Sequence, residues 1–339
     1  MRIVHAANYQ FKKDGTDFAN WDLKIHQGLV QAGHYVYPFS VSDQARMRSI
    51  TGHRDFGLKA ANTALVRTCV NIHPDILMLG HAQSVTRVTL EEIRKLLPEI
   101  RIALWYDDAI WEGMGNAHLF ERMPALDAMF ISTGGDVLEQ FAAPGRVVCF
   151  VPNPVESSIE CHKAFDCKDP EHDVIFFGRD DPGRNETLRQ IIAALPELRF
   201  AIFGCLGKPL VQGHAREQIV ARSRMALNLS RNNTTMLCSS NRLSDTVGNG
   251  VLTFCDAANG LDPLFTDDEV VYYKDVDEFV EKIRYFNTNN SERIRIAANG
   301  WRRMHACYSS EKVARYMVEV TCRMPDCEAP SLPRYRYGD

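Results

Sequence analysis

The chain has 339 residues, of which 45% are hydrophobic and 24% charged, and its formal net charge is −4 at pH 7. Its length predicts two domains, its composition excludes a disordered chain, and its slight acidic excess argues against a nucleic-acid surface. We expect neither a signal peptide nor a transmembrane segment, because no stretch approaches the roughly 18 apolar residues of a membrane span.

Cysteine usage bears on compartment and on metal binding. The ten cysteines are scattered along the chain without repeated close pairs, which favours a reducing cytoplasm over a disulfide framework. One segment, ECHKAFDCKDPEHD, holds residue types that zinc uses: Cys161, His162, Cys167 and His172. Zinc ligands usually pair at a spacing of two to four residues. This group matches that spacing only loosely, so we expect no metal site.

Strand and helix patterns alternate through the first half of the chain. Strands are predicted at 2–7, 34–41, 75–80, 101–108, 128–133 and 147–155. Helices are predicted at 21–33, 89–98, around 118–126 and at 136–143. Thr89 is the expected N-cap of the second helix, with Glu92 three residues later. Such alternation is typical of parallel strands joined by crossover helices, which is a Rossmann-like domain.

The alternation restarts after a polar stretch at 156–172. Strands are predicted at 173–178, 199–204, 225–230, 251–255 and 269–273, and helices at 186–198, 216–224, 242–250 and 276–286. The helical segment 291–324 is expected to cross back onto the first domain. We therefore predict an α/β fold of two Rossmann-like domains facing a central cleft, with boundaries at 1–155, 156–318 and a C-terminal helix end and tail at 319–339. The cleft, at the carboxyl ends of the strands, is the expected ligand site.

The stretch VIFFGRDDPGRNETL (174–188) carries the first chemical signal. Gly178 ends a strand and lets backbone approach a ligand, the following helix start offers free N–H groups, and Arg179 and Arg184 add guanidinium charge. Together these features predict a cradle for a diphosphate. The alternative is that both arginines pair with neighbouring acidic residues on a solvated loop.

A second signal lies in NRLSDTVGNGVLTF (241–254). Arg242 and Asp245 are three residues apart, so they share one face of a helix. A carboxylate there suits a ribose diol, and an arginine suits phosphate. The alternative is an ordinary helix with an Arg/Asp pair and a glycine C-cap.

The motifs FFGR, AIFG, ARSRMALNLSRN, RLSDTVGNGVLTF, DPLFTDDEVVYYKDVDEFVEKIRYF and IAANGWRRMHACYSSEKVARY follow in that order over roughly 172–318. This ordered set resembles the C-terminal nucleotide-sugar domain of group 1 glycosyltransferases of the GT-B fold, in the branch with the CgeB-like proteins. The segment HPDILMLGHAQSVTRVTLEEIRKLLPEIRIALWYDDAIW (73–111) is similar to the acceptor-side domain of the same branch.

The resemblance implies roles for particular residues. The diphosphate grip falls on Gly178, Arg179 and Arg184, with Gly204 ending the AIFG strand. The family's R-x-F-E turn matches Arg242 to Asp245, with aspartate in place of the glutamate that holds the ribose. A glutamate usual eight residues earlier is replaced by Leu237, which leaves the sugar to the nearby polar residues Ser239, Ser240 and Asn241.

On the acceptor side, the resemblance makes His81, Asp107 and Asp108 the candidates for orienting the acceptor or the sugar. For His81 the alternative is a histidine hydrogen-bonded at a strand end, and for the two aspartates it is capping of the next helix. The loop after the first strand, with Trp21 and Asp22, should face the cleft, although surface polarity explains its residues equally well.

The resemblance thus implies a cytoplasmic glycosyltransferase that needs no metal or other cofactor. It would transfer a sugar from a nucleotide diphosphate, UDP or GDP, to a hydroxyl of a surface polysaccharide, a lipid-linked acceptor or a protein glycan, with retention. No nucleic-acid partner is expected, and peripheral membrane contact stays open.

Three alternatives stand beside this interpretation. One is a catalytically silent nucleotide- or glycan-binding protein, which Leu237 and Asp245 motivate. Another is a nucleotide-sugar epimerase, which the few histidines of the second domain disfavour. A dinucleotide oxidoreductase is disfavoured because G-x-G-x-x-G is missing after the first strand.

Overall fold

A computed structural model describes residues 1–110, 116–231, 236–324 and 336–338. The chain divides into two compact units. The first comprises Met1–Pro152 together with Ser310–Asp339, and the second comprises Asn153–Ser309.

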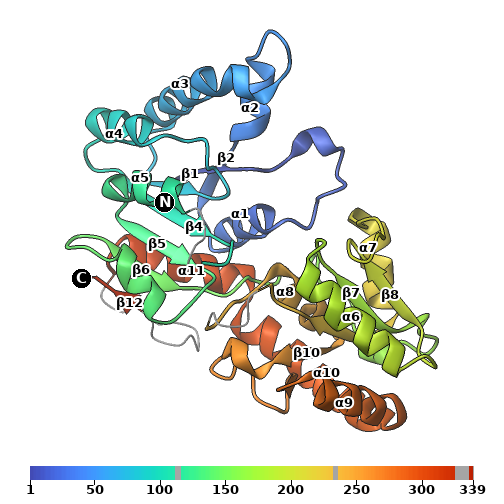
Figure 1. Cartoon of the computed structure of the whole chain (residues 1–339). Coiled ribbons are helices and arrows are strands. Elements are labelled where there is room, and N and C mark those ends of the chain that lie inside the picture. Colours follow the sequence, from blue (N-terminus) through green and yellow to red (C-terminus); the bar gives the residue numbers. More distant parts are fainter. Residues whose placement is uncertain (111–115, 232–235, 325–335, 339) are drawn as a thin grey trace. The chain divides into compact units, whose positions relative to one another are not determined.

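The first unit is built on one sheet, in the order β12-β6-β5-β4-β3-β1-β2 (Figure 1). Its strands are β1 (Arg2–Ala7), β2 (Tyr35–Ser40), β3 (Ile76–Leu79), β4 (Arg101–Tyr106), β5 (Ala128–Ile131), β6 (Val147–Phe150) and β12 (Arg336–Tyr337). All pairs are parallel except β12 with β6. Strands β3, β5 and β6 are buried at every residue, as expected for parallel strands covered on both faces.

The helices of the first unit are α1 (Trp21–Gln31), α2 (Val41–Met47), α3 (Arg54–Ile72), α4 (Arg87–Leu96), α5 (Ala117–Arg122) and α11 (Ser310–Thr321). Helices α2 and α3 were not predicted from the sequence. The segment Asp136–Phe141, predicted as a helix, is a 3-10 helix, η3. The predicted cap of α4 was wrong: Thr86 is the N-cap, and its side chain accepts a hydrogen bond from the Thr89 backbone N–H.

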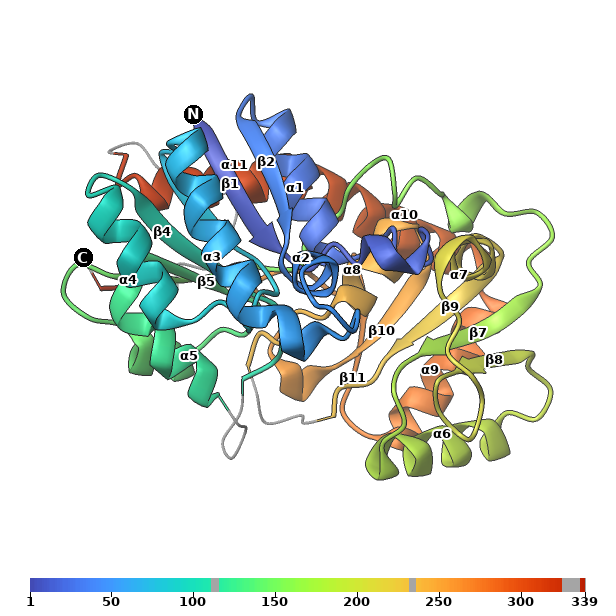
Figure 2. The ribbon, with the colours of Figure 1, turned by 90° about the horizontal axis from the view of Figure 1, so that it is seen from above.

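The C-terminal helix α11 packs against α1, as Figures 1 and 2 show. A Cβ on Gly28 of α1 would lie 2.1 Å from the Ser310 carbonyl oxygen, so the two helices approach closely only because this residue is glycine. The predicted return of the C-terminal helix to the first domain is confirmed.

The second unit is a five-stranded parallel sheet in the order β11-β10-β9-β7-β8. Its strands are β7 (His172–Phe177), β8 (Phe200–Phe203), β9 (Ser223–Asn228), β10 (Leu252–Asp256) and β11 (Val271–Tyr273). Its helices are α6 (Pro182–Ala194), α7 (Gly213–Ala221), α8 (Asn241–Gly248), α9 (Val276–Thr288) and α10 (Asn290–Cys307).

Apolar side chains fill both faces of this second sheet. Along β7, Val174 and Phe176 belong to one buried cluster, and Ile175 and Phe177 belong to the other. This alternation follows from the two-residue period of a strand. The predicted α/β class with two Rossmann-like domains is therefore confirmed.

Candidate functional site

In the second unit, two glycines bring the ends of β7 and β8 together. Gly204 follows β8 with a φ of +76°, and a Cβ there would lie 2.1 Å from the Gly178 carbonyl oxygen. A Cβ on Gly178 would lie 2.6 Å from the Phe176 ring and 3.4 Å from Nη2 of Arg242. Neither position has space for a larger residue, so the backbone after β7 runs directly beside the Arg242 guanidinium.

Arg242 and Arg184 converge on the end of β9. Nε of Arg184, on α6, and Nη1 of Arg242, on α8, each donate to the Leu229 carbonyl oxygen at 3.0 Å. Arg242 also donates to the Phe177 carbonyl oxygen and, at 3.2 Å, to Oδ1 of Asn228. The two guanidinium groups lie 5.9 Å and 4.7 Å from the Phe176 ring centre, Arg184 the farther. Carbonyl dipoles and one aromatic face therefore position both arginines.

The charge of these two arginines is not balanced locally. Within the described ranges, neither Arg184 nor Arg242 forms an ion pair with a carboxylate, and their partners are neutral oxygens. Burial lowers the pKa of Arg242 to about 9, and the neighbouring Arg184 and Arg216 add to this fall. A buried cation is costly unless it is paired. The pair is therefore suited to an anion with several oxygens, such as a diphosphate.

The exposed side chain of Arg179 follows Gly178 directly. Its carbonyl oxygen accepts hydrogen bonds from Nη1 of Arg184 at 3.4 Å and from the Cys205 thiol at 3.2 Å. Asp181 caps α6, because its side chain accepts from the Arg184 backbone N–H at 3.1 Å. Of the two arginines in the first motif, Arg184 is thus held inside the unit, and Arg179 is exposed to solvent and can contact a ligand there.

Asp245 lies one turn along α8 from Arg242 and is only 7% exposed. Its carboxylate forms an ion pair with the guanidinium of Arg216, from α7. Arg216 also lies over the Phe177 ring, 4.7 Å from its centre. The sequence analysis assigned no role to Arg216, which no motif marked.

The three polar residues expected near the sugar have structural partners. Ser239 is buried, and both its hydroxyl and its carbonyl oxygen accept hydrogen bonds from Asn153, at 3.0 Å and 2.8 Å. Ser240 caps α8 and donates to Oδ1 of Asn228 at 3.1 Å. The Asn241 carbonyl oxygen accepts from the Ser244 hydroxyl at 2.9 Å.

Leu237, where the family usually has glutamate, is fully buried with a φ of +52°. Thr234 and Thr235, which begin the stretch TTMLCSSN that leads to Ser239, Ser240 and Asn241, lie outside the described residues.

In the first unit, strand ends gather a second set of polar residues. Strands β1, β3 and β4 lie next to one another in the sheet. Asn8 comes directly after β1, His81 comes two residues after β3, and Asp107 comes directly after β4. Asp22, at the start of α1, accepts hydrogen bonds from the backbone N–H groups of Asn8 at 2.8 Å and His81 at 3.0 Å. The Trp21 ring meets the His81 ring edge-on at 6.0 Å. Asp22 thus organises the loop that carries His81, a role that its position in the sequence did not reveal.

His81 and Asp107 form a partly shielded ion pair. Nδ1 of His81 lies 3.5 Å from Oδ1 of Asp107, and the two side chains are 26% and 7% exposed. The Asp107 carboxylate raises the pKa of His81 to about 9. Burial raises the pKa of Asp107 to about 6, against the opposing effect of His81. At pH 7 the pair is therefore an imidazolium facing a carboxylate, and Asp108 follows it on the same loop.

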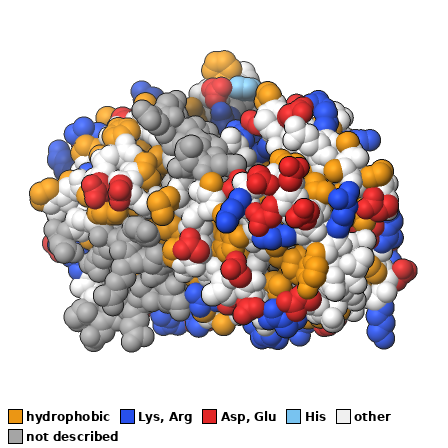
Figure 3. Space-filling view, turned by 60° about the horizontal axis from the view of Figure 1, so that its bottom comes forward, with side chains coloured by type: hydrophobic (Ala, Val, Ile, Leu, Met, Phe, Trp, Pro, Cys, Tyr) orange, Lys and Arg blue, Asp and Glu red, His pale blue; other side chains and the backbone are white. Residues whose placement is uncertain are grey.

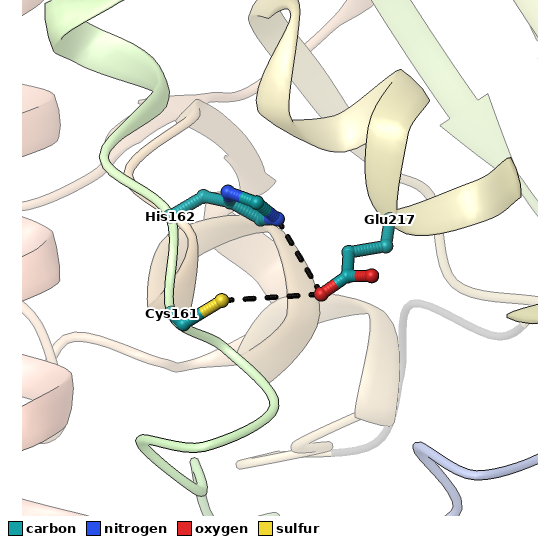
Figure 4. A group of neighbouring side chains, drawn as sticks. All are labelled: Cys161, His162 and Glu217. Carbon is teal, nitrogen blue, oxygen red and sulfur yellow. Dashed lines mark hydrogen bonds and ion pairs between the residues drawn. The ribbon is translucent and has the colours of Figure 1, made fainter. Parts of the chain in front are cut away.

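The group of cysteines and histidines at 161–172 is divided in the structure. Cys161 and His162 come together with Glu217 of α7, whereas Cys167 and His172 are not part of that cluster (Figure 4).

Charges are mixed on the face of the molecule drawn in Figure 3, where acidic and basic side chains are interspersed. Among the helices in the described ranges, none combines the length and the apolar character that a membrane crossing requires.

Comparison with known proteins finds one family model that matches part of the chain, mostly in the second unit. A family model described as glycosyl transferase-like matches residues 183–319. No curated protein sequence matches the chain.

Solved structures match over nearly the whole chain. HepE of Anabaena, in complex with UDP-glucose, is 11% identical with a TM-score of 0.61, covering 96% of this chain and 100% of its own. AviGT4, a glycosyltransferase involved in avilamycin A biosynthesis, is 16% identical with a TM-score of 0.57, covering 95% and 97%. Sucrose-phosphate synthase of Thermosynechococcus elongatus is 10% identical with a TM-score of 0.57, covering 96% and 99%. At these identities the likeness establishes the fold, which is that of GT-B glycosyltransferases.

Proposed function

We propose that this chain, whose residues 183–319 match a family model described as glycosyl transferase-like, transfers a sugar from a nucleoside-diphosphate sugar to an acceptor hydroxyl. One observation carries the proposal. The guanidinium groups of Arg184, which is buried, and Arg242, which is half-buried, lie at the carboxyl ends of β7 and β9 and have only neutral oxygen partners within the described residues. A diphosphate would supply the missing negative charge.

The donor is proposed to bind the second unit through three contacts. Arg184 and Arg242 neutralise the diphosphate from the protein side, and the exposed Arg179 binds it from the solvent side. Asp245 accepts hydrogen bonds from the ribose hydroxyls. UDP is the nucleotide to test first, because the similar HepE structure holds UDP-glucose. No metal cofactor is needed in this proposal, since the guanidinium groups offset the charge of the leaving diphosphate.

Sugar transfer breaks the bond between the anomeric carbon and the β-phosphate oxygen, and forms a bond from that carbon to the acceptor oxygen. We propose that the acceptor proton passes to the leaving phosphate oxygen, with retention at the anomeric carbon. His81 is not suited to take that proton at pH 7, because Asp107 keeps its imidazole protonated. Its proposed role is to donate a hydrogen bond to the sugar or the acceptor, whose hydroxyls donate in turn to the carboxyl oxygens of Asp107 and Asp108, so that the three residues together orient it.

The proposed acceptor is a hydroxyl of a surface polysaccharide, a lipid-linked glycan or a protein glycan, and the proposed setting is the cytoplasm. The chemistry of the described residues favours none of the three acceptors over the others. Ser239, Ser240 and Asn241 are proposed to lie beside the donor sugar, although the hydroxyls of both serines already have partners inside the unit.

A two-stage experiment tests the function. First, melting temperatures are measured with UDP, GDP, ADP, CMP and dTDP, with and without magnesium, since a ligand of the native state raises the melting temperature. Second, the sugar esters of the binding nucleotide are incubated with a panel of glycan acceptors, and free nucleotide and product are quantified. A shift with one diphosphate followed by transfer supports the proposal. Failure of every diphosphate to bind would overturn it.

A specific feature favours one second candidate, a nucleotide-binding protein without turnover. Leu237 is fully buried at the position where the family usually has an acidic residue near the donor sugar. Under this reading the first stage gives a shift and the second gives no product with any acceptor. A single clean transfer product would exclude it.

A further inference from the structure

We propose that Cys161, His162 and Glu217 bind one zinc ion. Cys161 and His162 lie on the segment before the 3-10 helix η4 (Ala164–Asp166), and Glu217 lies in the middle of α7. All three belong to the second unit. Figure 4 shows the thiol and the imidazole both directed at the Glu217 carboxylate.

The three donor atoms have nearly the separations that zinc imposes. Oε1 of Glu217 lies 3.4 Å from Nε2 of His162 and 3.9 Å from Sγ of Cys161, and all three atoms lie within 4.8 Å of one another. A tetrahedral zinc ion with bonds of about 2.0 to 2.3 Å holds its ligand atoms about 3.3 to 3.8 Å apart. The Cys161 side chain is exposed and would rotate to close the remaining difference.

The residue types select the metal. A thiolate, an imidazole and a carboxylate form a ligand set typical of zinc, whereas magnesium and calcium prefer oxygen ligands. Nε2 of His162 is shielded from water and makes no hydrogen bond of ordinary geometry in the part of the chain that the structure describes. A metal ion would occupy that nitrogen's lone pair. Binding would release the Cys161 thiol proton to solvent and form a sulfur–zinc bond.

The surroundings supply the support that metal ligands usually have. Nδ1 of His214, one turn before Glu217 on α7, lies 2.9 Å from Oε2, the other carboxylate oxygen. This contact leaves Oε1 directed at the other two ligands, as an outer partner of a zinc ligand does. The His162 backbone N–H donates to Oδ1 of Asn249 at 3.1 Å, which holds the segment in place. Three protein ligands would leave one position to water.

Zinc at this position would tie α7 to the segment before η4. The residue next to Glu217 on that helix is Arg216, which pairs with Asp245. The metal would therefore fix the helix that carries this partner of Asp245. Zinc binding itself does not depend on the proposed sugar transfer, so it is tested without nucleotide.

The experiment uses the full chain, reduced with a phosphine, stripped with a chelator and titrated with zinc chloride against a chromophoric zinc indicator. We expect one equivalent of zinc per chain, and in the cobalt-loaded chain the absorption of a thiolate–cobalt bond. Cys161→Ser is expected to abolish that absorption and weaken zinc binding at least tenfold. Glu217→Gln should weaken binding similarly, and His214→Ala by about 10- to 100-fold, as outer partners do.

The matched control is Cys167→Ser, which removes a thiol from the same segment but outside the cluster. It should keep both the stoichiometry and the cobalt absorption. The proposal is overturned if Cys161→Ser binds zinc as tightly as the unaltered chain, or if Cys167→Ser loses binding to the same degree. Cys161 is exposed, so its serine variant is expected to fold, and circular dichroism checks this.

Discussion

The Arg216 guanidinium on α7 forms an ion pair with the Asp245 carboxylate on α8. The pair is largely withdrawn from solvent, with the two side chains 27% and 10% exposed. A ribose that binds Asp245 must therefore share the carboxylate with Arg216 or displace it. Since aspartate is one methylene shorter than the family's usual glutamate, Arg216 also fixes where the shorter side chain points.

Asp245→Asn is expected to weaken UDP binding by about 10- to 100-fold, because a hydrogen bond to a charged group contributes about 1.5 to 3 kcal/mol. Isothermal titration calorimetry measures the change. The 2′-deoxy analogue of UDP provides the control. It should bind the unaltered chain more weakly than UDP, and Asp245→Asn should bind the two nucleotides alike. A 2′-deoxy penalty of the same size in the variant would show that Asp245 does not hold the ribose.

Arg179→Ala is expected to weaken UDP binding by about 10- to 100-fold without changing the melting temperature of the free protein, because Arg179 is exposed and its side chain is assigned to the diphosphate. The matched control is Arg189→Ala. Arg189 is another exposed arginine, on α6, where it pairs with Glu186 at 3.5 Å. Equal losses in the two variants would indicate a general charge effect and contradict the assignment.

Gly204→Ala is expected to destabilise the second unit by more than about 3 kcal/mol. A Cβ there would lie 2.1 Å from the Gly178 carbonyl oxygen, and the positive φ adds strain. Gly207→Ala is the control, because Gly207 has a similar φ of +72° but nothing within 4 Å of the added carbon. It should cost only about 1 kcal/mol. Urea denaturation compares them, and equal costs would mean that the close approach of β7 and β8 has no energetic weight.

The stability of the first unit is expected to fall between pH 6.5 and about 9. The pKa of His81 is raised from 6.5 to about 9 in the folded chain, so its protonation stabilises the fold fully below pH 6.5, and that contribution is lost as pH rises through 9. The loss should amount to about 1 to 3 kcal/mol. His81→Gln should flatten this part of the profile, which urea denaturation at each pH measures.

Asp107 titrates over a lower pH range than His81, so the loss of stability above pH 6.5 can be attributed to His81 by experiment. Its raised pKa, from 3.8 to about 6, means that its ionisation opposes folding as pH rises across that interval. A profile in which His81→Gln keeps the full alkaline loss of stability would show that another group titrates there.

Local sequence was sufficient to predict those helices and strands whose conformation depends on their own residues. The apolar run before Gly178 predicted β7, and a helix was predicted to follow it at 186–198; the helix that follows, α6, begins four residues earlier, at Pro182. The first and last residues of the helices were predicted less accurately. Thr89 and Thr86 are both acceptable caps by residue type, and the one used is set by where the loop from β3 enters α4.

Sequence reasoning also explains why α2 and α3 were missed. The buried residues of α3 include Gly57, Ala61 and Ala64, which give no strong apolar period. A Cβ on Gly57 would lie 1.7 Å from the Ala45 carbonyl oxygen. The N-terminal half of α3 therefore packs through this close contact with α2, while its larger buried side chains, Leu65 and Val66, lie only in its second half.

The sequence by itself determined the α/β class, most strands of both sheets and the two arginine motifs, because strand periodicity and short turns are local properties of the chain. Only the tertiary structure joined Arg216 to Asp245, Glu217 to Cys161 and His162, and His81 to Asp107. Those partners lie on different elements. His81 and Asp107 meet because the neighbouring parallel strands β3 and β4 bring their carboxyl ends to one edge of the sheet, whereas Arg216 and Glu217 extend from the middle of α7 to α8 and to the segment before η4. The separation of two residues in the sequence does not indicate whether they meet in the folded chain.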